Sequence, residues 1–231
     1  MGAKNLSAGG VASAESYSTL AITGYGQMRT GWAAVRFALG GSGWFNNGSG
    51  TASNNPGPDN TVPFLSDANV AKFKAFGKNA FRLVEIYGSI NDGELSGGKA
   101  AMKARVIEGL NKLYSWDPGI KVVLWGPEPF SMPSPGDMSA VGNIHDLNRQ
   151  GMMEAAAEHP AVIGFIDQNN PATPFWYGTG SEASPISTSP QSSFVGMDGI
   201  HYNHDGGAHL ADLGYTAMGE LLIDRERLIV S

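Results

Sequence analysis

The chain has 231 residues, a length that fits one domain with a substantial hydrophobic core. Its 15 Lys and Arg residues against 21 Asp and Glu residues give a net charge of −6, which argues against nucleic acid and against an acidic membrane surface as partners. No apolar run approaches the roughly 20 residues that cross a bilayer, and the start of the chain lacks the apolar region of a signal peptide. We therefore expect a soluble chain. Its compartment, secretion after removal of a signal peptide included, and its oligomeric state stay open.

Cysteine is absent from the sequence. Disulfides, thiolate metal sites and a cysteine nucleophile are therefore excluded together.

Three short apolar runs stand out along the chain, at 81–87, 120–125 and 161–166. Their length and their content of β-branched residues predict buried strands. The first 40 residues are less distinct, and residues 31–38 fit a helix or a strand.

Helical patterns separate these runs. The segment between the first two keeps a helical spacing of apolar residues, namely Met102, Val106, Leu110 and Leu113. It ends at the stop signal 116–119. A second helix is expected over 144–159, and a last one over about 208–228.

The alternation of strands and helices predicts an α/β fold, a three-layer α/β/α sandwich with a mostly parallel sheet, in one domain over residues 1–231. In such a sheet the ligand crevice lies beyond the carboxyl ends of the strands. The loops 88–92, 126–129 and 167–170 follow the three strands, so we expect them to share that edge.

The sequence Asp198-Gly199-Ile200-His201 sets a carboxylate three residues before an imidazole. At this spacing a turn can direct the acid to one ring nitrogen and leave the other for a nucleophile. Asn91, after the first strand, offers an amide donor at the same edge, and residues 40–43 offer backbone N–H groups to an oxyanion.

These blocks resemble those of the SGNH hydrolases, the GDSL-type esterases and lipases, in their order along the chain. Asn91 stands in a block similar to Gly-x-Asn-Asp, and Asp198 and His201 stand in the Asp-x-x-His block. Gly41 resembles the family's glycine block that supplies a second oxyanion donor, and residues 175–180 (FWYGTG) resemble a Trp-x-x-Gly-Thr-Gly loop that some members carry ahead of the histidine block. The resemblance extends from about residue 13 to residue 222 and implies a flavodoxin-like sandwich.

The nucleophile block departs from the family's Gly-Asp-Ser. Its nearest counterpart is Ala14-Glu15-Ser16, which makes Ser16 the expected nucleophile. Ser89, where a second glycine is common, and Tyr202, where proline usually follows the histidine, also depart from the pattern. A divergent enzyme and an inactive relative that binds carbohydrate are both compatible with these differences.

The resemblance implies a serine ester hydrolase. His201 would take the proton of Ser16 as the hydroxyl attacks an acyl carbonyl, and Asp198 would orient the imidazolium. The Ser16 and Gly41 N–H groups and the Asn91 amide would form the oxyanion hole. The substrate would be a small ester, an acylated carbohydrate or a lipid, and neither a cofactor nor a metal is expected.

A metal site is a weaker alternative. It would use the imidazole and carboxylate groups of His201, His204, Asp205 and His209. Their spacing matches no recognised ligand run, and a Gly-Gly pair interrupts any helix that would align them.

A glycosidase is a second alternative. Glu128 would pair with Asp167 or Asp92 as acid and base. The chain is short for an eight-unit barrel, and few strands are visible.

A binding module without catalysis is the third alternative. Its stacking surface for sugar rings would consist of aromatic residues, namely Trp44, Phe175, Trp176 and Tyr177. The same residues fit a hydrophobic core equally well.

Overall fold

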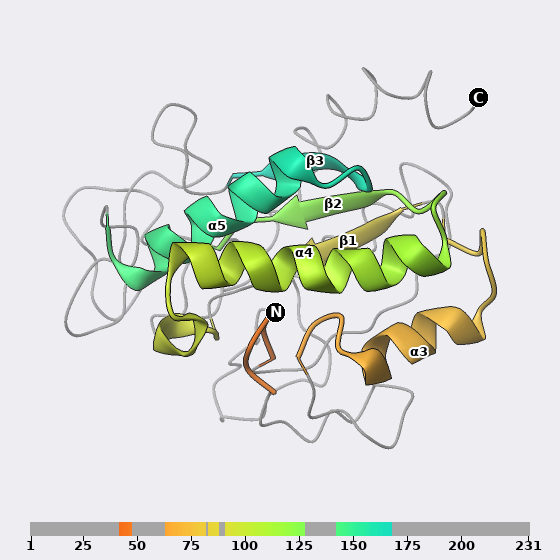
Figure 1. Ribbon diagram of the computed structural model, residues 1–231, viewed down its shortest axis with the longest axis horizontal. Coiled ribbons are helices and arrows are strands. Elements are labelled where there is room, and N and C mark those ends of the chain that lie inside the picture. Colours follow the sequence, from red (N-terminus) through yellow and green to blue (C-terminus); the bar gives the residue numbers. More distant parts are fainter. Residues whose placement is uncertain (1–41, 48–62, 82, 88–90, 128–141, 168–231) are drawn as a thin grey trace, which may run out of the picture. The chain divides into compact units, whose positions relative to one another are not determined.

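The computed structural model describes residues 42–47, 63–81, 83–87, 91–127 and 142–167 (Figure 1). Within them the chain forms, in order, α3 (Asp67–Ala75), β1 (Val84–Tyr87), the short 3-10 helix η2 (Gly93–Ser96), α4 (Lys99–Trp116), β2 (Val122–Trp125), α5 (Ile144–Glu158) and β3 (Val162–Ile166). Strands and helices alternate from β1 to β3, so this part of the chain has the predicted α/β character.

The three strands form a parallel sheet in the order β1-β2-β3. Val122 of the central strand pairs with Val84 of β1 and with Val162 of β3. The predicted strands are confirmed, but each begins one to three residues later than the apolar run that predicts it. Strand pairing explains these later starts, because the sheet begins where Val84, Val122 and Val162 lie side by side.

The two helices predicted between the strands are confirmed as α4 and α5. α5 begins after Asn143, whose side chain accepts a 2.9 Å hydrogen bond from the Asp146 N–H group. It ends before His159, which has extended backbone angles because the next residue, Pro160, disfavours a helical conformation there. α4 ends in the same way at Asp117, which precedes a proline.

α3 is a helix that the sequence analysis does not predict. Its signal is a cap: the Ser66 hydroxyl accepts a hydrogen bond from the Asn69 N–H group, and Asp67 lies in the first turn. Only Val70 and Phe73 of this helix are buried. A short helix with two buried positions gives too little apolar periodicity to be recognised.

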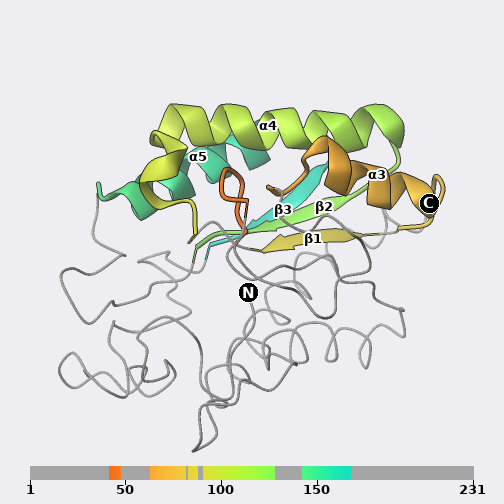
Figure 2. The same ribbon diagram turned by 90° about the horizontal axis from the view of Figure 1, so that it is seen from below.

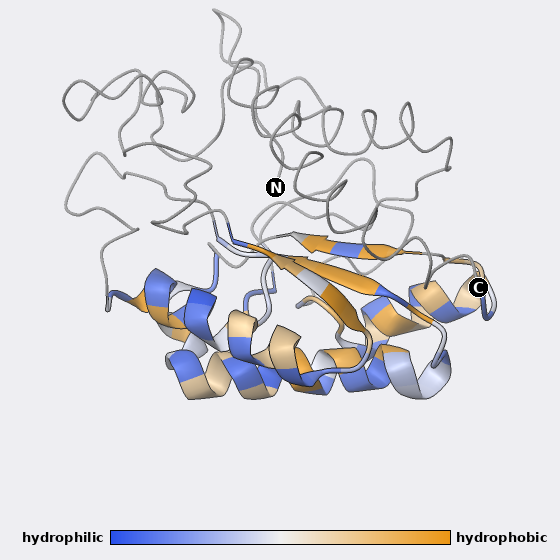
Figure 3. Cartoon of the chain, turned by 90° about the horizontal axis from the view of Figure 1, so that it is seen from above, coloured by the Kyte–Doolittle hydropathy of each residue, from blue (hydrophilic) through white to orange (hydrophobic). Residues whose placement is uncertain are grey.

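The hydrophobic core lies between the sheet and the helices. Figure 2 shows α3, α4 and α5 on one face of the sheet, and Figure 3 shows the apolar character of the strands. The strand residues in this core are Val84, Ile86, Val122 and Leu124, and they pack with buried residues of α4 and α5 such as Val106, Leu110 and Met152. Each fully buried aliphatic side chain of this kind contributes roughly 1.5 to 3 kcal/mol through removal from water.

Several predictions concern residues beyond this part of the chain. The expected helix at 208–228 and the segment 31–38 lie outside the described residues. The helices of the described part all lie on one face of the sheet, so the second helical layer of a three-layer sandwich stays a prediction. The described residues belong to one compact unit, and the prediction of a single domain over 1–231 stays a prediction. In the ranges given above, no helix combines the length and the apolarity that a membrane span needs.

Candidate functional site

The carboxyl edge of the sheet gathers the segments that follow the strands. Asn91 and Asp92 follow β1, Gly126 and Pro127 follow β2, and Asp167 follows β3. Because the strands are parallel, these ends share one edge of the sheet, as the sequence predicts.

Asn91 is bound to the segment 42–47, which lies on the side of the sheet that carries α4 (Figure 2). Its Nδ2 donates a 3.0 Å hydrogen bond to the carbonyl oxygen of Ser42, and its own carbonyl accepts a 2.9 Å bond from Nδ2 of Asn46. A carboxamide nitrogen has two N–H groups, and the bond to Ser42 uses one of them. Asn91 therefore presents an amide directly beside the residue that follows Gly41.

Asp92 holds the same segment through its carboxylate. Oδ2 accepts the Trp44 N–H at 3.0 Å, and Oδ1 accepts the N–H groups of Phe45 at 2.7 Å and Asn46 at 3.2 Å. Three successive backbone N–H groups therefore converge on one carboxylate. The side chain is almost fully buried, with the residue 1% exposed, so these bonds replace the water that the carboxylate would otherwise bind.

Gly43 explains how the carboxylate approaches the backbone so closely. A Cβ atom at this position would lie 2.3 Å from Oδ1 of Asp92, a distance that real Cβ atoms do not reach. Only glycine leaves the space that the Asp92 carboxylate occupies.

Opposing effects act on the charge of Asp92. Burial raises its pKa above the ordinary value of 3.8, while the three backbone hydrogen bonds and the charge of Arg105 act in the opposite direction. Arg105 of α4 also donates from Nε to the Trp44 carbonyl at 2.9 Å. The segment 42–47 is thus bound from both Asp92 and α4.

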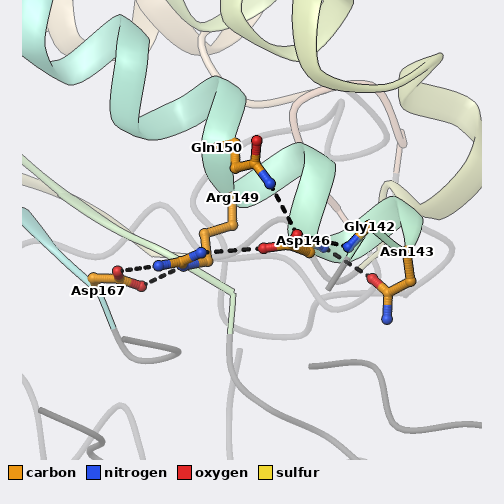
Figure 4. Close-up of polar contacts among 6 residues, drawn as sticks. All are labelled: Gly142, Asn143, Asp146, Arg149, Gln150 and Asp167. Atoms are coloured by element: carbon orange, nitrogen blue, oxygen red, sulfur yellow. Dashed lines mark hydrogen bonds and ion pairs between the residues drawn. The ribbon is translucent and has the colours of Figure 1, made fainter. Parts of the chain in front are cut away.

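A second polar cluster connects the start of α5 with Asp167, the residue that follows β3 (Figure 4). Arg149 of α5 donates from Nε to Oδ1 of Asp167 at 2.7 Å and from Nη1 to Oδ1 of Asp146 at 3.1 Å. Asp146 also accepts hydrogen bonds from the Gly142 N–H group and from the Gln150 side chain. Hydrogen bonding to Asp167 is the main cause that raises the pKa of Arg149 above its usual range, so the guanidinium stays charged.

Most of the predicted catalytic residues fall outside the part of the chain that the structure describes. These are Ser16, Gly41, Asp198 and His201. Asn91 is described, and it lies at the predicted edge of the sheet.

The residues of the alternative hypotheses lie partly inside and partly outside the described ranges. Glu128 and His201, His204, Asp205 and His209 lie outside the described ranges. Asp92 and Asp167, the expected partners of Glu128, each bind protein groups already, namely a loop backbone and Arg149. These bonds give both carboxylates a structural role and disfavour a glycosidase built on them.

Trp44 corrects one expectation of the binding-module alternative. Its side chain is fully buried in the core, where its ring meets Phe64 edge to face with centroids 5.7 Å apart. It is therefore no stacking platform for a sugar. The other aromatic residues of that alternative, 175–177, lie outside the described residues.

Comparisons with family models, with curated proteins and with solved structures find no match for this chain. Among the described residues, no group of three or more His, Asp or Glu side chains is arranged to bind a metal ion.

Two residues at this edge have roles that the sequence analysis does not assign. Asp92 is considered there only as a glycosidase carboxylate, and Arg149 is not considered at all. A usable signal for Arg149 was its place three residues after Asp146, a spacing that favours an ion pair on a helix. No local signal shows that Asp92 binds a segment 46 to 48 residues away.

Proposed function

We propose that the chain is a serine ester hydrolase of the SGNH kind, with Ser16 as nucleophile, His201 as general base and Asp198 as the residue that orients the histidine. The oxyanion hole consists of the Ser16 and Gly41 N–H groups and the Asn91 amide. One observation carries most of the support: Nδ2 of Asn91 binds the carbonyl of Ser42, the neighbour of Gly41 in the chain. Two blocks that the proposal brings to one site, 50 residues apart in the sequence, thus come from segments in direct contact.

The proposed reaction proceeds in two halves. The Ser16 hydroxyl attacks the acyl carbonyl as His201 accepts its proton, and the tetrahedral oxyanion is stabilised by the N–H donors. His201 then protonates the leaving alcohol, and an acyl-enzyme remains on Ser16. Water, activated by the same histidine, releases the acid. The substrate is a small ester, an acylated carbohydrate or a lipid, and no cofactor takes part.

The proposal includes a three-layer α/β/α sandwich. Its support is the parallel sheet with α3, α4 and α5 on one face and the β1-α4-β2-α5-β3 order of the chain. In this architecture the site lies at the carboxyl edge of the sheet, where Asn91 is found.

The deciding experiment is labelling with a fluorophosphonate, which reacts with activated serines. We expect one label per chain, mapped by peptide analysis to Ser16, and hydrolysis of nitrophenyl acetate that is lost in Ser16→Ala. Ser18→Ala is the matched control, because Ser18 lies two residues away in the same segment, and it should keep both properties. A label elsewhere, or equal hydrolysis by the wild type and Ser16→Ala, contradicts the proposal. Cleavage of nitrophenyl glycosides and not of nitrophenyl acetate would favour the glycosidase hypothesis.

A further inference from the structure

We propose that Asp92 is a positioning residue for the oxyanion hole. It binds the backbone of residues 44–46 and thereby fixes the segment whose Ser42 carbonyl orients the Asn91 carboxamide. This inference rests on the proposed function, and it assigns to Asp92 no contact with the substrate.

The orientation of Asn91 depends on the position of Ser42. The Ser42 carbonyl can only accept a hydrogen bond, so the nitrogen of the carboxamide, and not its oxygen, faces it at 3.0 Å. Because the carboxamide is planar, this contact also sets the direction of the second N–H group. Oxyanion donors act through such fixed directions, and a displacement of about 1 Å can reduce a rate about 100-fold.

The position of Ser42 depends in turn on Asp92. Ser42 begins the tight segment 42–47, in which it forms an isolated bridge with Asn47 and the Gly43 N–H binds the Asn46 carbonyl at 3.0 Å. The carboxylate of Asp92 accepts the three N–H groups at the centre of this segment. No carboxamide can replace it fully, because an NH₂ group in place of Oδ2 would face the Trp44 N–H, donor against donor.

The chain offers a matched control in Asp117. This residue is also a buried aspartate, 5% exposed, and its carboxylate also accepts backbone N–H groups, from Asn79 at 2.7 Å and from Gly119 at 3.1 Å. It precedes β2, however, and so lies at the amino edge of the parallel sheet. The variant Asp117→Asn therefore removes a buried carboxylate that is distant from the carboxyl edge of the sheet.

The test compares Asp92→Asn with Asp117→Asn in the full chain. We expect both variants to unfold at lower urea concentration than the wild type. Only Asp92→Asn should reduce kcat for nitrophenyl acetate, by about 10-fold or more, with KM within about threefold, since the donors act on the transition state. Backbone hydrogen exchange of Trp44, Phe45 and Asn46 should also be faster in Asp92→Asn alone.

A second variant keeps the test decisive if Asp92→Asn does not fold. Gly43→Ala retains the carboxylate but fills its space, so it should reduce kcat in the same way. Wild type that neither hydrolyses the ester nor takes the fluorophosphonate on Ser16 overturns the proposed function, and this inference with it. Active wild type with kcat in Asp92→Asn or Gly43→Ala within about twofold of Asp117→Asn overturns the role of Asp92 alone.

Discussion

Arg149 and Asp167 form a two-point ion pair between α5 and the end of β3, with Nε 2.7 Å from Oδ1 and Nη2 2.5 Å from Oδ2. Both side chains are largely buried, at 15% and 13% exposure. Two parallel hydrogen bonds between a planar guanidinium and a carboxylate fix distance and angle together. The pair therefore sets the position of α5 relative to the carboxyl edge of the sheet.

Removal of Asp167 would leave the largely buried Arg149 guanidinium with Asp146, at 3.1 Å, as its remaining carboxylate partner. Asp167→Asn should lower the free energy of unfolding by about 2 to 4 kcal/mol, as measured by urea denaturation. The control is Glu154→Gln, which breaks the 2.5 Å pair with Lys99 and a 3.5 Å pair with Lys103. The Lys99 and Glu154 side chains are each 42% exposed and that of Lys103 is 27% exposed, so water screens these charges and Glu154→Gln should lower the free energy of unfolding clearly less than Asp167→Asn does. Equal decreases in the free energy of unfolding in the two variants would show that the largely buried Arg149–Asp167 pair stabilises the fold no more than an exposed pair does.

Gly151 of α5 allows the close contact of this helix with α4. An added Cβ would lie 2.4 Å from the Lys99 carbonyl oxygen and 3.0 Å from Cβ of Met102. Gly151→Ala should therefore destabilise the protein by about 2 kcal/mol, although helix propensity alone favours alanine by about 1 kcal/mol. Ala104→Gly, at an exposed position in the interior of α4, measures the propensity effect by itself. Stabilisation by Gly151→Ala would contradict the close contact.

His159 is buried in its neutral form after α5. Its Nδ1 accepts the Ala161 N–H at 3.2 Å, so the proton is on Nε2, which lies 3.3 Å from Oδ1 of Asn111. The ring also meets Tyr114 edge to face. Burial lowers the pKa of His159 from its ordinary value of 6.5.

This shift predicts a loss of stability in acid. Between the lowered pKa of the folded state and 6.5, the unfolded chain binds more protons, so the free energy of unfolding falls as the pH decreases through this range. We expect a larger fall from pH 8 to pH 5 in the wild type than in His159→Gln, measured by urea denaturation at both pH values. Parallel pH profiles of the two proteins would show that the histidine titrates alike in the folded and unfolded states.

The carboxamide of Asn91 should contribute directly to kcat. Asn91→Ala removes one proposed oxyanion donor and should reduce kcat about 100- to 1000-fold, with residual activity from the remaining donors. Asn46→Ala is the control, because it removes the 2.9 Å bond to the Asn91 carbonyl and leaves the Asn91 carboxamide in place. It should reduce kcat by less than about 10-fold. Similar kcat values in both variants would mean that Asn91 only connects the end of β1 to the segment 42–47 and does not act on the oxyanion.

The sequence predicted the three strands and the helices α4 and α5, because each depends on a local apolar pattern and a local stop signal. The runs of β-branched residues and the spacing of Met102, Val106 and Leu110 are properties of short segments. The order of strand and helix also predicted a parallel sheet, and with it the edge at which Asn91 lies. α3 was not predicted, because the cap at Ser66 and two buried residues form too short an apolar pattern to indicate a helix.

The partners of the side chains at that edge, in contrast, follow from how distant segments pack together. Trp44 fits a sugar platform or a core by its residue type alone, and packing placed it in the core. Asp92 fits a catalytic acid by its position, and its three bonds to a segment 46 to 48 residues away make it an anchor. A hydrogen bond between distant segments leaves no periodic signal in either one, since it depends on the distance and direction that folding sets between them.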